Sequence, residues 1–215
     1  KTLKDIPAQY ILIKTQKEKE ALAQAIEESQ LFAFDTETDS LYTHNAQLKG
    51  IAIVTQTNKG WFLPYQEEDG DFLRELFGNE AYTKIGHNLK FDIAILENHD
   101  CPIKGTCYDT LIAHSLIEPE QRHNLDILAE NILSYKTIPF SELAPDAKKG
   151  APIDYESIDI DTLTNYAIED ADITFQLWQL LKPQLESLGQ SEVFYNIEMP
   201  LLPVLIASEK EGINI

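Results

Sequence analysis

Three acidic side chains stand at alternate positions where an apolar segment of the chain ends. In the stretch FAFDTETDSLY, Asp35, Glu37 and Asp39 follow the apolar run 31–34. Alternate residues of a strand share a face, so an extended backbone would direct these carboxylates the same way. Like charges that close repel, and one of them resists ionisation. Such a cluster at the end of a buried strand requires a cation or a strong set of hydrogen-bond donors.

Further groups that could converge with these acids lie on two other segments. Asp92 lies in the first turns of a helix that we expect to begin after Asn88. Tyr166 and Asp170 are four residues apart in the longest predicted helix, 161–188, so they share a face. Ligands that are all oxygen atoms favour Mg²⁺ or Mn²⁺ over zinc. Two such ions about 4 Å apart stabilise both the attacking and the leaving oxygen in phosphoryl transfer.

The elements that must position these residues alternate between extended and helical patterns. Apolar runs predict strands at 10–14, 31–35, 48–55, 59–65 and 83–86. Periodic apolar positions predict helices at 17–29 and 71–78, after Asn88, and at 109–117, 124–133 and 161–188, the last capped by Asp159 or Asp161. The proline-containing segment 136–160 predicts irregular structure with one short helix. We therefore expect an α/β fold with a mixed central sheet flanked by helices.

The charge of the chain bears on its partners. Its 17 Lys and Arg residues against 36 Asp and Glu give a net charge of −19. A groove that grips a long duplex would need the opposite sign. Divalent cations could instead supply positive charge at the reacting phosphate, and a site for a few terminal nucleotides needs few basic residues. Apolar runs stay short of the roughly 18 residues of a membrane span, so we expect no membrane partner. We also expect a cytoplasmic protein and a monomer.

Two cysteines allow an alternative kind of metal site. Cys101 and Cys107 are separated by five residues, which is neither a redox nor a zinc spacing. His99 lies beside them and keeps zinc as an alternative. The simpler interpretation is a pair of reduced thiols in a cytoplasmic protein.

Three stretches carry a resemblance to a known family. FAFDTETDSL, KIGHNLKFDIAIL and YAIEDADITFQLW, in this order, resemble the exonuclease motifs of the tyrosine-bearing branch of the DEDD superfamily. With RHNLDILAE, KTIPFSEL and NIEMPLLPVLIASEKEGINI, they resemble the bacterial DNA polymerase I family. The resemblance implies a ribonuclease H-like (DnaQ-like) fold. It places a 3′→5′ exonuclease domain at 1–190, with a lead-in at 1–14, and a truncated start of the polymerase domain at 191–215.

The same resemblance implies a mechanism. Asp35, Glu37 and Asp170 would hold a first Mg²⁺ or Mn²⁺ ion, and Asp35 would also reach a second, with Asp92 acting partly through water. Tyr166 would position the attacking water or hydroxide. The expected activity is two-metal-ion hydrolysis that releases 5′-mononucleotides from single-stranded or frayed DNA 3′ ends during proofreading. The expected partners are a single-stranded DNA 3′ end and the polymerase domain of the same parent chain.

Contacts with the substrate are implied at other positions. Leu41 and Phe140 match family positions that wedge and stack terminal bases, a grip that tolerates any sequence. Further candidates, for which a structural role is equally open, are Asn88, Lys90, Arg122 and His123.

Several neighbouring residues match no ligand position in the family. Asp39 is predicted to stabilise the turn after its strand, and Asp109 is a candidate buried acid behind the site. Glu169 and Asp172 lie beside the last motif without a predicted role, and we leave His87 out because its motif position varies.

Two other functions remain as alternatives. The first is an exoribonuclease of the same superfamily, against which the polymerase-like segment after Phe194 argues. The second is a catalytically silent module that binds DNA ends or braces a polymerase, against which the complete set of acids argues. Residues 199–206 would expose apolar surface unless another element covers them.

Overall fold

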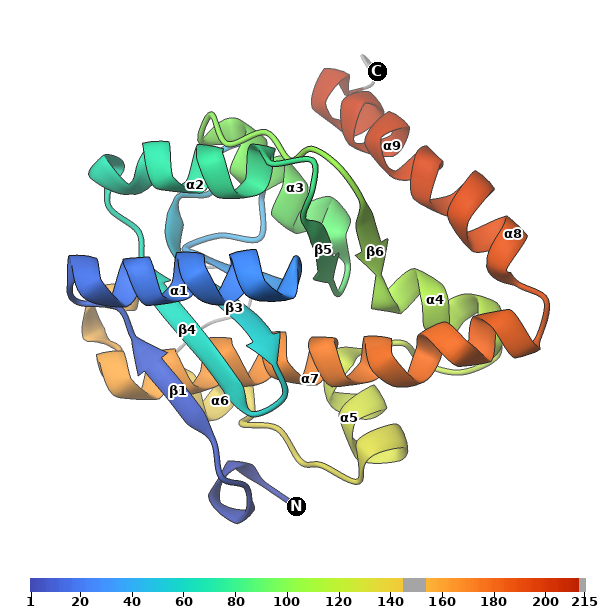
Figure 1. Ribbon diagram of the computed structural model, residues 1–215, viewed down its shortest axis with the longest axis horizontal. Coiled ribbons are helices and arrows are strands. Elements are labelled where there is room, and N and C mark those ends of the chain that lie inside the picture. The colour runs from blue at the N-terminus through green and yellow to red at the C-terminus, as the bar shows by residue number, and fades with distance from the viewer. Residues whose placement is uncertain (145–153, 213–215) are drawn as a thin grey trace.

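A mixed six-stranded sheet forms the centre of the molecule (Figure 1). The computed structural model describes residues 1–144 and 154–212. The strands lie in the order β1-β4-β3-β2-β5-β6. Their bounds are Gln9–Leu12 for β1, Leu31–Thr38 for β2, Leu48–Gln56 for β3, Lys59–Pro64 for β4, Thr83–Gly86 for β5 and Cys107–Asp109 for β6. β3 is antiparallel to both of its neighbours, β2 and β4, whereas β1 pairs in parallel with β4, β5 with β2, and β6 with β5.

Helices cover both faces of this sheet. Their bounds are Gln16–Ser29 for α1, Gly70–Gly78 for α2, Leu89–Asn98 for α3, Thr110–Ile117 for α4, Leu125–Leu133 for α5, Phe140–Leu143 for α6, Ile160–Ser187 for α7, Ser191–Val193 for α8 and Met199–Glu211 for α9. Short 3-10 helices lie at Leu3–Asp5, Glu67–Asp69 and Tyr155–Ser157, and a π-helical turn at Phe194–Glu198 joins α8 to α9. None of the described helices combines the length and apolarity needed to cross a membrane.

Strand β2 divides the core into two layers by its alternation. Phe32 and Phe34 point toward α1, α2 and α3, where both pack edge-on against Phe77. Ala33 points to the opposite face and packs in the cluster that α4, α5 and α7 complete. Because alternate residues share a face, Asp35 and Glu37 continue the Ala33 row and look toward α7.

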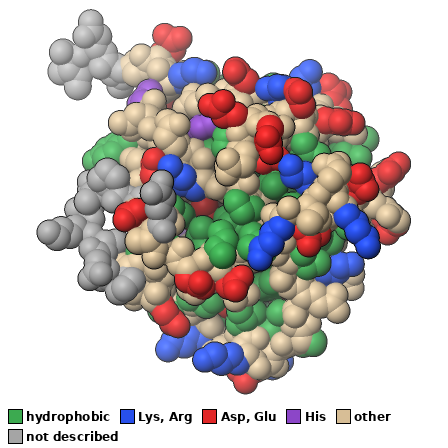
Figure 2. Space-filling model, turned by 90° about the vertical axis from the view of Figure 1, so that its left-hand side faces the viewer, with side chains coloured by type: hydrophobic (Ala, Val, Ile, Leu, Met, Phe, Trp, Pro, Cys, Tyr) green, Lys and Arg blue, Asp and Glu red, His purple; other side chains and the backbone are tan. Residues whose placement is uncertain are grey.

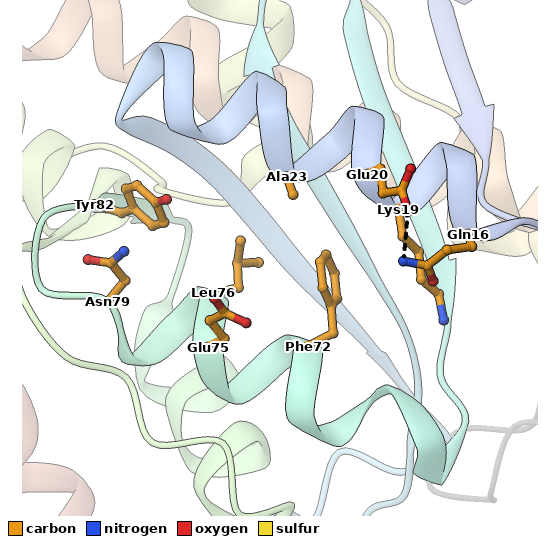
Figure 3. A pocket seen from close by; sticks show the side chains of 9 residues that line it. All are labelled: Gln16, Lys19, Glu20, Ala23, Phe72, Glu75, Leu76, Asn79 and Tyr82. Carbon is orange, nitrogen blue, oxygen red and sulfur yellow. Dashed lines mark hydrogen bonds between the residues drawn. The ribbon is translucent and has the colours of Figure 1, made fainter.

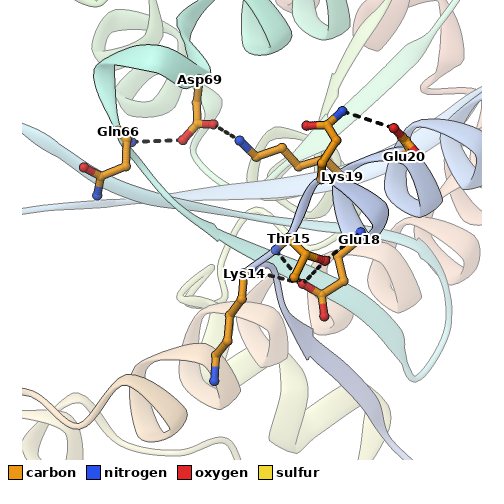
Figure 4. Close-up of polar contacts among 8 residues, drawn as sticks. Lys14, Thr15, Glu18, Lys19, Glu20, Gln66 and Asp69 are labelled. Atoms are coloured by element: carbon orange, nitrogen blue, oxygen red, sulfur yellow. Dashed lines mark hydrogen bonds and ion pairs between the residues drawn. The ribbon is translucent and has the colours of Figure 1, made fainter.

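The start of α1 fixes the first layer (Figure 4). Thr15 and Glu18 form a capping box, in which Glu18 Oε2 accepts from the Thr15 N–H at 2.8 Å. One turn in, the Lys19 ammonium pairs with the buried Asp69 carboxylate in the 3-10 helix that precedes α2. These contacts hold α1 and the connection to α2 together over the sheet.

Helix α7 runs across the second layer and carries two of the predicted site residues. Asp159 caps it by accepting from the Thr162 N–H at 2.9 Å, so the first of the two predicted caps is confirmed. The helix contacts β2, β3 and β4 along its length. Leu163, Ala167 and Ala171 are among its buried residues, which turns the intervening Tyr166 and Asp170 toward the end of β2.

The predicted mixed sheet flanked by helices is confirmed, with one strand more than predicted. β6 has three residues, too few to show an alternation. Within 136–160, α6 and a 3-10 helix are present, and residues 145–153 of the predicted irregular segment lie outside the described residues.

The predicted apolar surface of 199–206 is only partly exposed. Leu202 and Ile206 are buried in the core layer that α3 helps to form, whereas Leu201, Val204 and Leu205 remain exposed.

Candidate active site at the end of strand β2

Asp35 and Glu37 reach the site from the last residues of β2. Glu37 is buried, with 6% of its surface exposed, and Asp35 is half-buried. The pairing with β3 shifts register between Glu37 and Thr38, and this bulge ends the regular strand. Asp39 follows the bulge, and its Oδ1 accepts from the Gln47 N–H at 2.8 Å. The prediction that Asp39 stabilises the turn is therefore confirmed.

Asp92 joins the site from the first turn of α3. Its Oδ1 accepts from the Thr36 N–H at 3.0 Å and from the Thr36 hydroxyl at 2.6 Å, so the helix is fastened to β2 next to Asp35. Asn88 begins the helix in the left-handed conformation, at φ 66°. Asp109 accepts from the N–H groups of Asn88 and Leu89 at 3.1 and 2.8 Å. The buried Asp109 thus supports the backbone that presents Asp92.

The pKa directions show that the four predicted acids form one electrostatic group. Burial raises the pKa of Asp35 well above its ordinary value, and the charges that add to this come from Asp92, Glu37 and Asp170. Burial raises the pKa of Asp170 well above its ordinary value, and among the neighbouring charges Glu37 contributes most to the rise. For Glu37 and for Asp92, burial raises the pKa to about 7. Carboxyl groups arranged in this way favour a bound cation, which would offset both burial and repulsion.

Tyr166 completes this group from α7. Burial and the charge of Asp170 raise its pKa, so its hydroxyl remains protonated at neutral pH. Its ring lies edge-on to Phe140, with the ring centroids 6.4 Å apart. Tyr166 therefore contacts Phe140, a predicted substrate residue, and lies near the acids.

The residues present fit a hard divalent cation in their chemistry. Glu37 Oε1 is buried and has no hydrogen-bond partner among the described residues. An open oxygen in a cluster of carboxylates suits Mg²⁺ or Mn²⁺, which prefer oxygen ligands. Within 1–144 and 154–212, no group of three or more His, Cys, Asp or Glu side chains is arranged to hold a metal ion as it stands. Side chains of the cluster would therefore have to adjust on binding, while Glu37 Oε1 is already open.

Sequence patterns did not reveal Tyr155. Its hydroxyl donates to Glu37 Oε2 at 2.8 Å from the 3-10 helix Tyr155–Ser157. The two residues are 118 positions apart, and the segment around Tyr155 has no periodicity that predicts a contact. The one feature of the sequence that could have indicated this contact is the position of Tyr155 just before the longest helix.

A cavity adjoins the acids on the side of α5 and α6. Its volume is about 420 Å³, and its lining includes Asp126, Lys136, Phe140, Tyr166 and Asp170. Phe140 is 40% exposed and could stack on a base there. This cavity brings one predicted substrate residue together with two predicted catalytic residues.

The other predicted substrate residues lie apart from this cavity. Leu41 is 83% exposed on the loop after β2. Lys90 pairs with Glu209 of α9, and His123 Nδ1 lies 2.8 Å from His114 Nδ1.

Asn88 and Arg122 are both exposed, and Asn88 stands at the start of α3. For all of these residues substrate contact stays a prediction, and for Lys90, His123 and Asn88 the structure also shows a local structural role.

A second hollow lies between α1 and α2 and has a volume of about 210 Å³ (Figure 3). Ala23 of α1 faces Phe72 and Leu76 of α2 across it. It lies against the sheet face opposite to Asp35 and Glu37. We therefore assign it no part in the reaction.

The cysteines fit the simpler of the two interpretations. Both are free: Cys101 is buried, and Cys107 is half-buried. The Cys101 thiol lies 3.3 Å from the His99 carbonyl oxygen. The pKa of Cys107 is raised by burial to about 11, so this thiol is protonated at neutral pH.

Solved structures of several nucleases share this fold. A nuclease in its apo form superimposes with a TM-score of 0.76 over 95% of both chains at 20% identity. Brucella melitensis NrnC with bound Mg²⁺ gives a TM-score of 0.72 at 21% identity, over 86% of this chain and 87% of that one. Escherichia coli RNase D, an exoribonuclease, gives 0.71 at 16% identity, over 93% and 51%. The fold is that of the ribonuclease H-like DEDD exonucleases.

Sequence comparisons narrow this class to one family. A family model described as 3′–5′ exonuclease matches residues 10–186, and the chain belongs to that family. DNA polymerase I of Rhizobium leguminosarum is 31% identical over 86% of this chain and 21% of its own length. DNA polymerase I of Pseudomonas aeruginosa is 32% identical over 94% and 24%. The chain thus spans about a quarter or less of the length of these relatives.

Proposed function

We propose that the chain is a metal-dependent 3′→5′ exodeoxyribonuclease that releases 5′-mononucleotides from single-stranded or frayed DNA ends. The observation that carries this proposal is the convergence of Asp35, Glu37, Asp92 and Asp170 from three elements beside the protonated Tyr166. DNA polymerase I relatives support DNA as the substrate and proofreading as the role.

In this proposal the four acids hold two divalent ions, Mg²⁺ or Mn²⁺. Such ions, when bound, supply the positive charge that a phosphodiester requires during hydrolysis. The charges of both Asp92 and Asp170 contribute to the raised pKa of Asp35, so Asp35 is the carboxylate suited to bind both ions. Glu37 contributes its open Oε1.

Tyr166 orients the attacking water in the proposed reaction. Its hydroxyl is protonated at neutral pH, as in an ordinary tyrosine, and burial and the charge of Asp170 raise its pKa further, so it can donate a hydrogen bond to a water molecule that approaches the phosphate. A residue that only orients water works without changing its own protonation state. We therefore assign Tyr166 to positioning and the acids to cation binding.

The terminal nucleotides would lie in the 420 Å³ cavity beside Phe140. Stacking on an aromatic ring tolerates every base, as a proofreading site requires. Figure 2 shows acidic and basic side chains interspersed on one face of the molecule, around an apolar area, rather than a continuous basic surface. A short single strand, rather than a long duplex, suits this distribution.

We also propose that residues 191–215 begin the polymerase portion of a longer parent chain. The similarity to DNA polymerase I supports this assignment. Helix α9 nevertheless packs on α3, with Leu202 and Ile206 in the core. A cut at residue 190 would therefore remove a part of the core of the exonuclease domain.

The experiment compares DNA and RNA strands of one sequence, each labelled at its 5′ end. The proposal predicts a ladder that shortens from the 3′ end of DNA with Mg²⁺ or Mn²⁺ and no shortening with EDTA. Faster cleavage of RNA would instead favour the exoribonuclease alternative, which the RNase D fold similarity motivates.

An Asp35→Ala variant, purified in the same way, controls for contaminating nucleases. Binding of a DNA end by the wild type without cleavage of either strand, at any concentration of either metal, would favour the silent module.

A further inference from the structure

In the part of the chain that the structure describes, three tyrosine hydroxyls donate to buried carboxylates on the same side of the sheet. Each pair joins residues far apart in the chain, and the distances are similar. The pairs are Tyr10 with Asp172 at 2.7 Å, Tyr135 with Glu169 at 2.6 Å and Tyr155 with Glu37 at 2.8 Å.

In two of these pairs the protein engages both oxygens of the carboxylate. Asp172 Oδ1 also accepts from the Asn58 N–H at 3.1 Å and from the Gln176 side-chain amide at 3.0 Å. Glu169 Oε2 accepts from the Ile138 N–H at 2.5 Å. Both carboxylates have a complete set of partners, as structural acids in a protein core do.

The third pair leaves one oxygen open. Tyr155 occupies Glu37 Oε2, whereas Glu37 Oε1 is buried without a partner among the described residues. Glu37 stands at the bulge that ends β2, so Tyr155 joins the 3-10 helix before α7 to that bulge. A carboxylate held at one oxygen and open at the other is oriented but still able to bind.

We propose that Tyr155 is a positioning residue, which holds Glu37 by Oε2 so that Oε1 remains available to a divalent cation shared with Asp35 and Asp170. This inference rests on the proposed function. A hydrogen bond to a ligand carboxylate limits its rotation before the cation arrives, and loss of such a bond typically weakens metal affinity about tenfold to a hundredfold.

A purely structural role makes a different prediction. The hydroxyl could serve only to fasten the 3-10 helix before α7 to β2. Its removal would then lower the melting temperature and leave the affinity for metal unchanged. The measurement must therefore separate affinity from stability.

The experiment measures Mn²⁺ binding by calorimetry without DNA, for the wild type and for Tyr155→Phe. We expect the dissociation constant of Tyr155→Phe to rise about tenfold or more. Tyr10→Phe removes an equivalent hydroxyl from a closed carboxylate, and Ser157→Ala removes the Ser157 bond to the Asp154 carbonyl in the same 3-10 helix. Both controls should bind Mn²⁺ within about twofold of the wild type.

A second readout follows nuclease activity against the concentration of Mn²⁺. Tyr155→Phe should need more metal for half-maximal activity, and its KM for DNA should stay unchanged at saturating metal. Melting temperatures without metal identify any variant that has lost its fold.

The outcomes separate this inference from the function on which it rests. If the wild type binds Mn²⁺ and Tyr155→Phe binds it equally or more tightly, the role of Tyr155 is refuted and the proposed function stands. If the wild type binds no Mn²⁺, the proposed function fails, and the role of Tyr155 fails with it.

Discussion

Two adjacent acids on α7, Glu169 and Asp170, differ in the hydrogen-bond partners of their carboxylate oxygens. Glu169 is fully buried, and Tyr135 and Ile138 engage its two oxygens. Asp170 is half-buried, faces the end of β2, and has other carboxylates as its neighbours. Burial raises the pKa of both. A raised pKa alone therefore does not distinguish an acid of a functional site from a structural acid of the core. Whether both carboxylate oxygens have hydrogen-bond partners does distinguish them.

The largest effect should come from neutralising one of these two acids. Asp170→Asn removes a charge from the proposed cation site, and we expect the nuclease rate to fall about 10³-fold, which corresponds to about 4 kcal/mol. Glu169→Gln alters a structural acid, and its rate should stay within about threefold of the wild type. Single-turnover cleavage of a labelled DNA strand measures both. Equal losses in the two variants would remove the distinction.

Two tyrosines on this side of the sheet extend the comparison. Tyr166→Phe should lower the rate about 10²-fold because it removes the group that orients water, while Mn²⁺ affinity stays the same. Tyr135→Phe removes a hydroxyl that donates only to the structural Glu169, and its rate should change little. Rates at saturating metal and saturating DNA are the appropriate measurement. A normal rate for Tyr166→Phe would assign its hydroxyl to structure.

The pH dependence of stability tests the open carboxylates as a group. The pKa values of Glu37 and Asp92 are about 7 in the folded protein, above their ordinary values. Between the ordinary pKa values of 4.5 and 3.8 and this raised value, the folded chain binds more protons than the unfolded one, so stability is lost as the pH rises over that interval. Without metal, the melting temperature should fall by several degrees between about pH 4.5 and about pH 7, and it should level off at higher pH.

Two features sharpen this test. Burial lowers the pKa of His87 from 6.5 to about 4, so its opposite effect on stability lies between these values and offsets only a part of the loss from the two acids. Saturating Mn²⁺ should flatten the decline, since ionised carboxylates bind the cation. A melting temperature that rises over this interval in EDTA would contradict the assignment of Glu37 and Asp92.

A smaller effect is expected at the closed carboxylate Asp172. Asp172→Asn weakens its bonds with Tyr10, Asn58 and Gln176, so we expect unfolding in urea to require about 1–3 kcal/mol less. Activity per folded molecule should be unchanged. Asp39→Asn, at the partly exposed turn, is a matched control and should cost less. A loss of catalysis in folded Asp172→Asn would place this acid in the site.

The smallest effect is expected from substrate stacking. Phe140→Ala removes a half-exposed ring beside Tyr166, and loss of about 1 kcal/mol of stacking raises the KM for DNA about fivefold. Ile138→Val, in the same cavity lining, is the control. Initial rates over a range of DNA concentrations give KM. An unchanged KM would leave the cavity without a role in binding.

Sequence patterns predict which of the acids share a face, but not what surrounds them. The apolar run before Asp35 indicates a buried strand, and the four-residue spacing of Tyr166 and Asp170 places them on one face of a helix. Both patterns are local and can be read from the sequence. Simple alternation directs Asp39 to the same face as Glu37, and only the bulge at Glu37 and Thr38 removes it.

Contacts between distant segments could not be predicted in the same way. Tyr155 reaches Glu37 across 118 positions from an aperiodic segment, and Lys90 pairs with Glu209 across 119. The three-residue strand β6 exists because β5 pairs with it, and its own sequence has no alternation. The open oxygen of Glu37 likewise follows from tertiary packing and has no signature in the sequence.

The central claim is that the open carboxylates, and not the closed ones, hold divalent cations. Anomalous scattering from a crystal soaked in Mn²⁺ tests it most directly. The account predicts peaks among Asp35, Glu37, Asp92 and Asp170, with Glu37 Oε1 as a ligand and Tyr155 still on Oε2. Peaks at Glu169 or Asp172, or none at the end of β2 in saturating Mn²⁺, would contradict it.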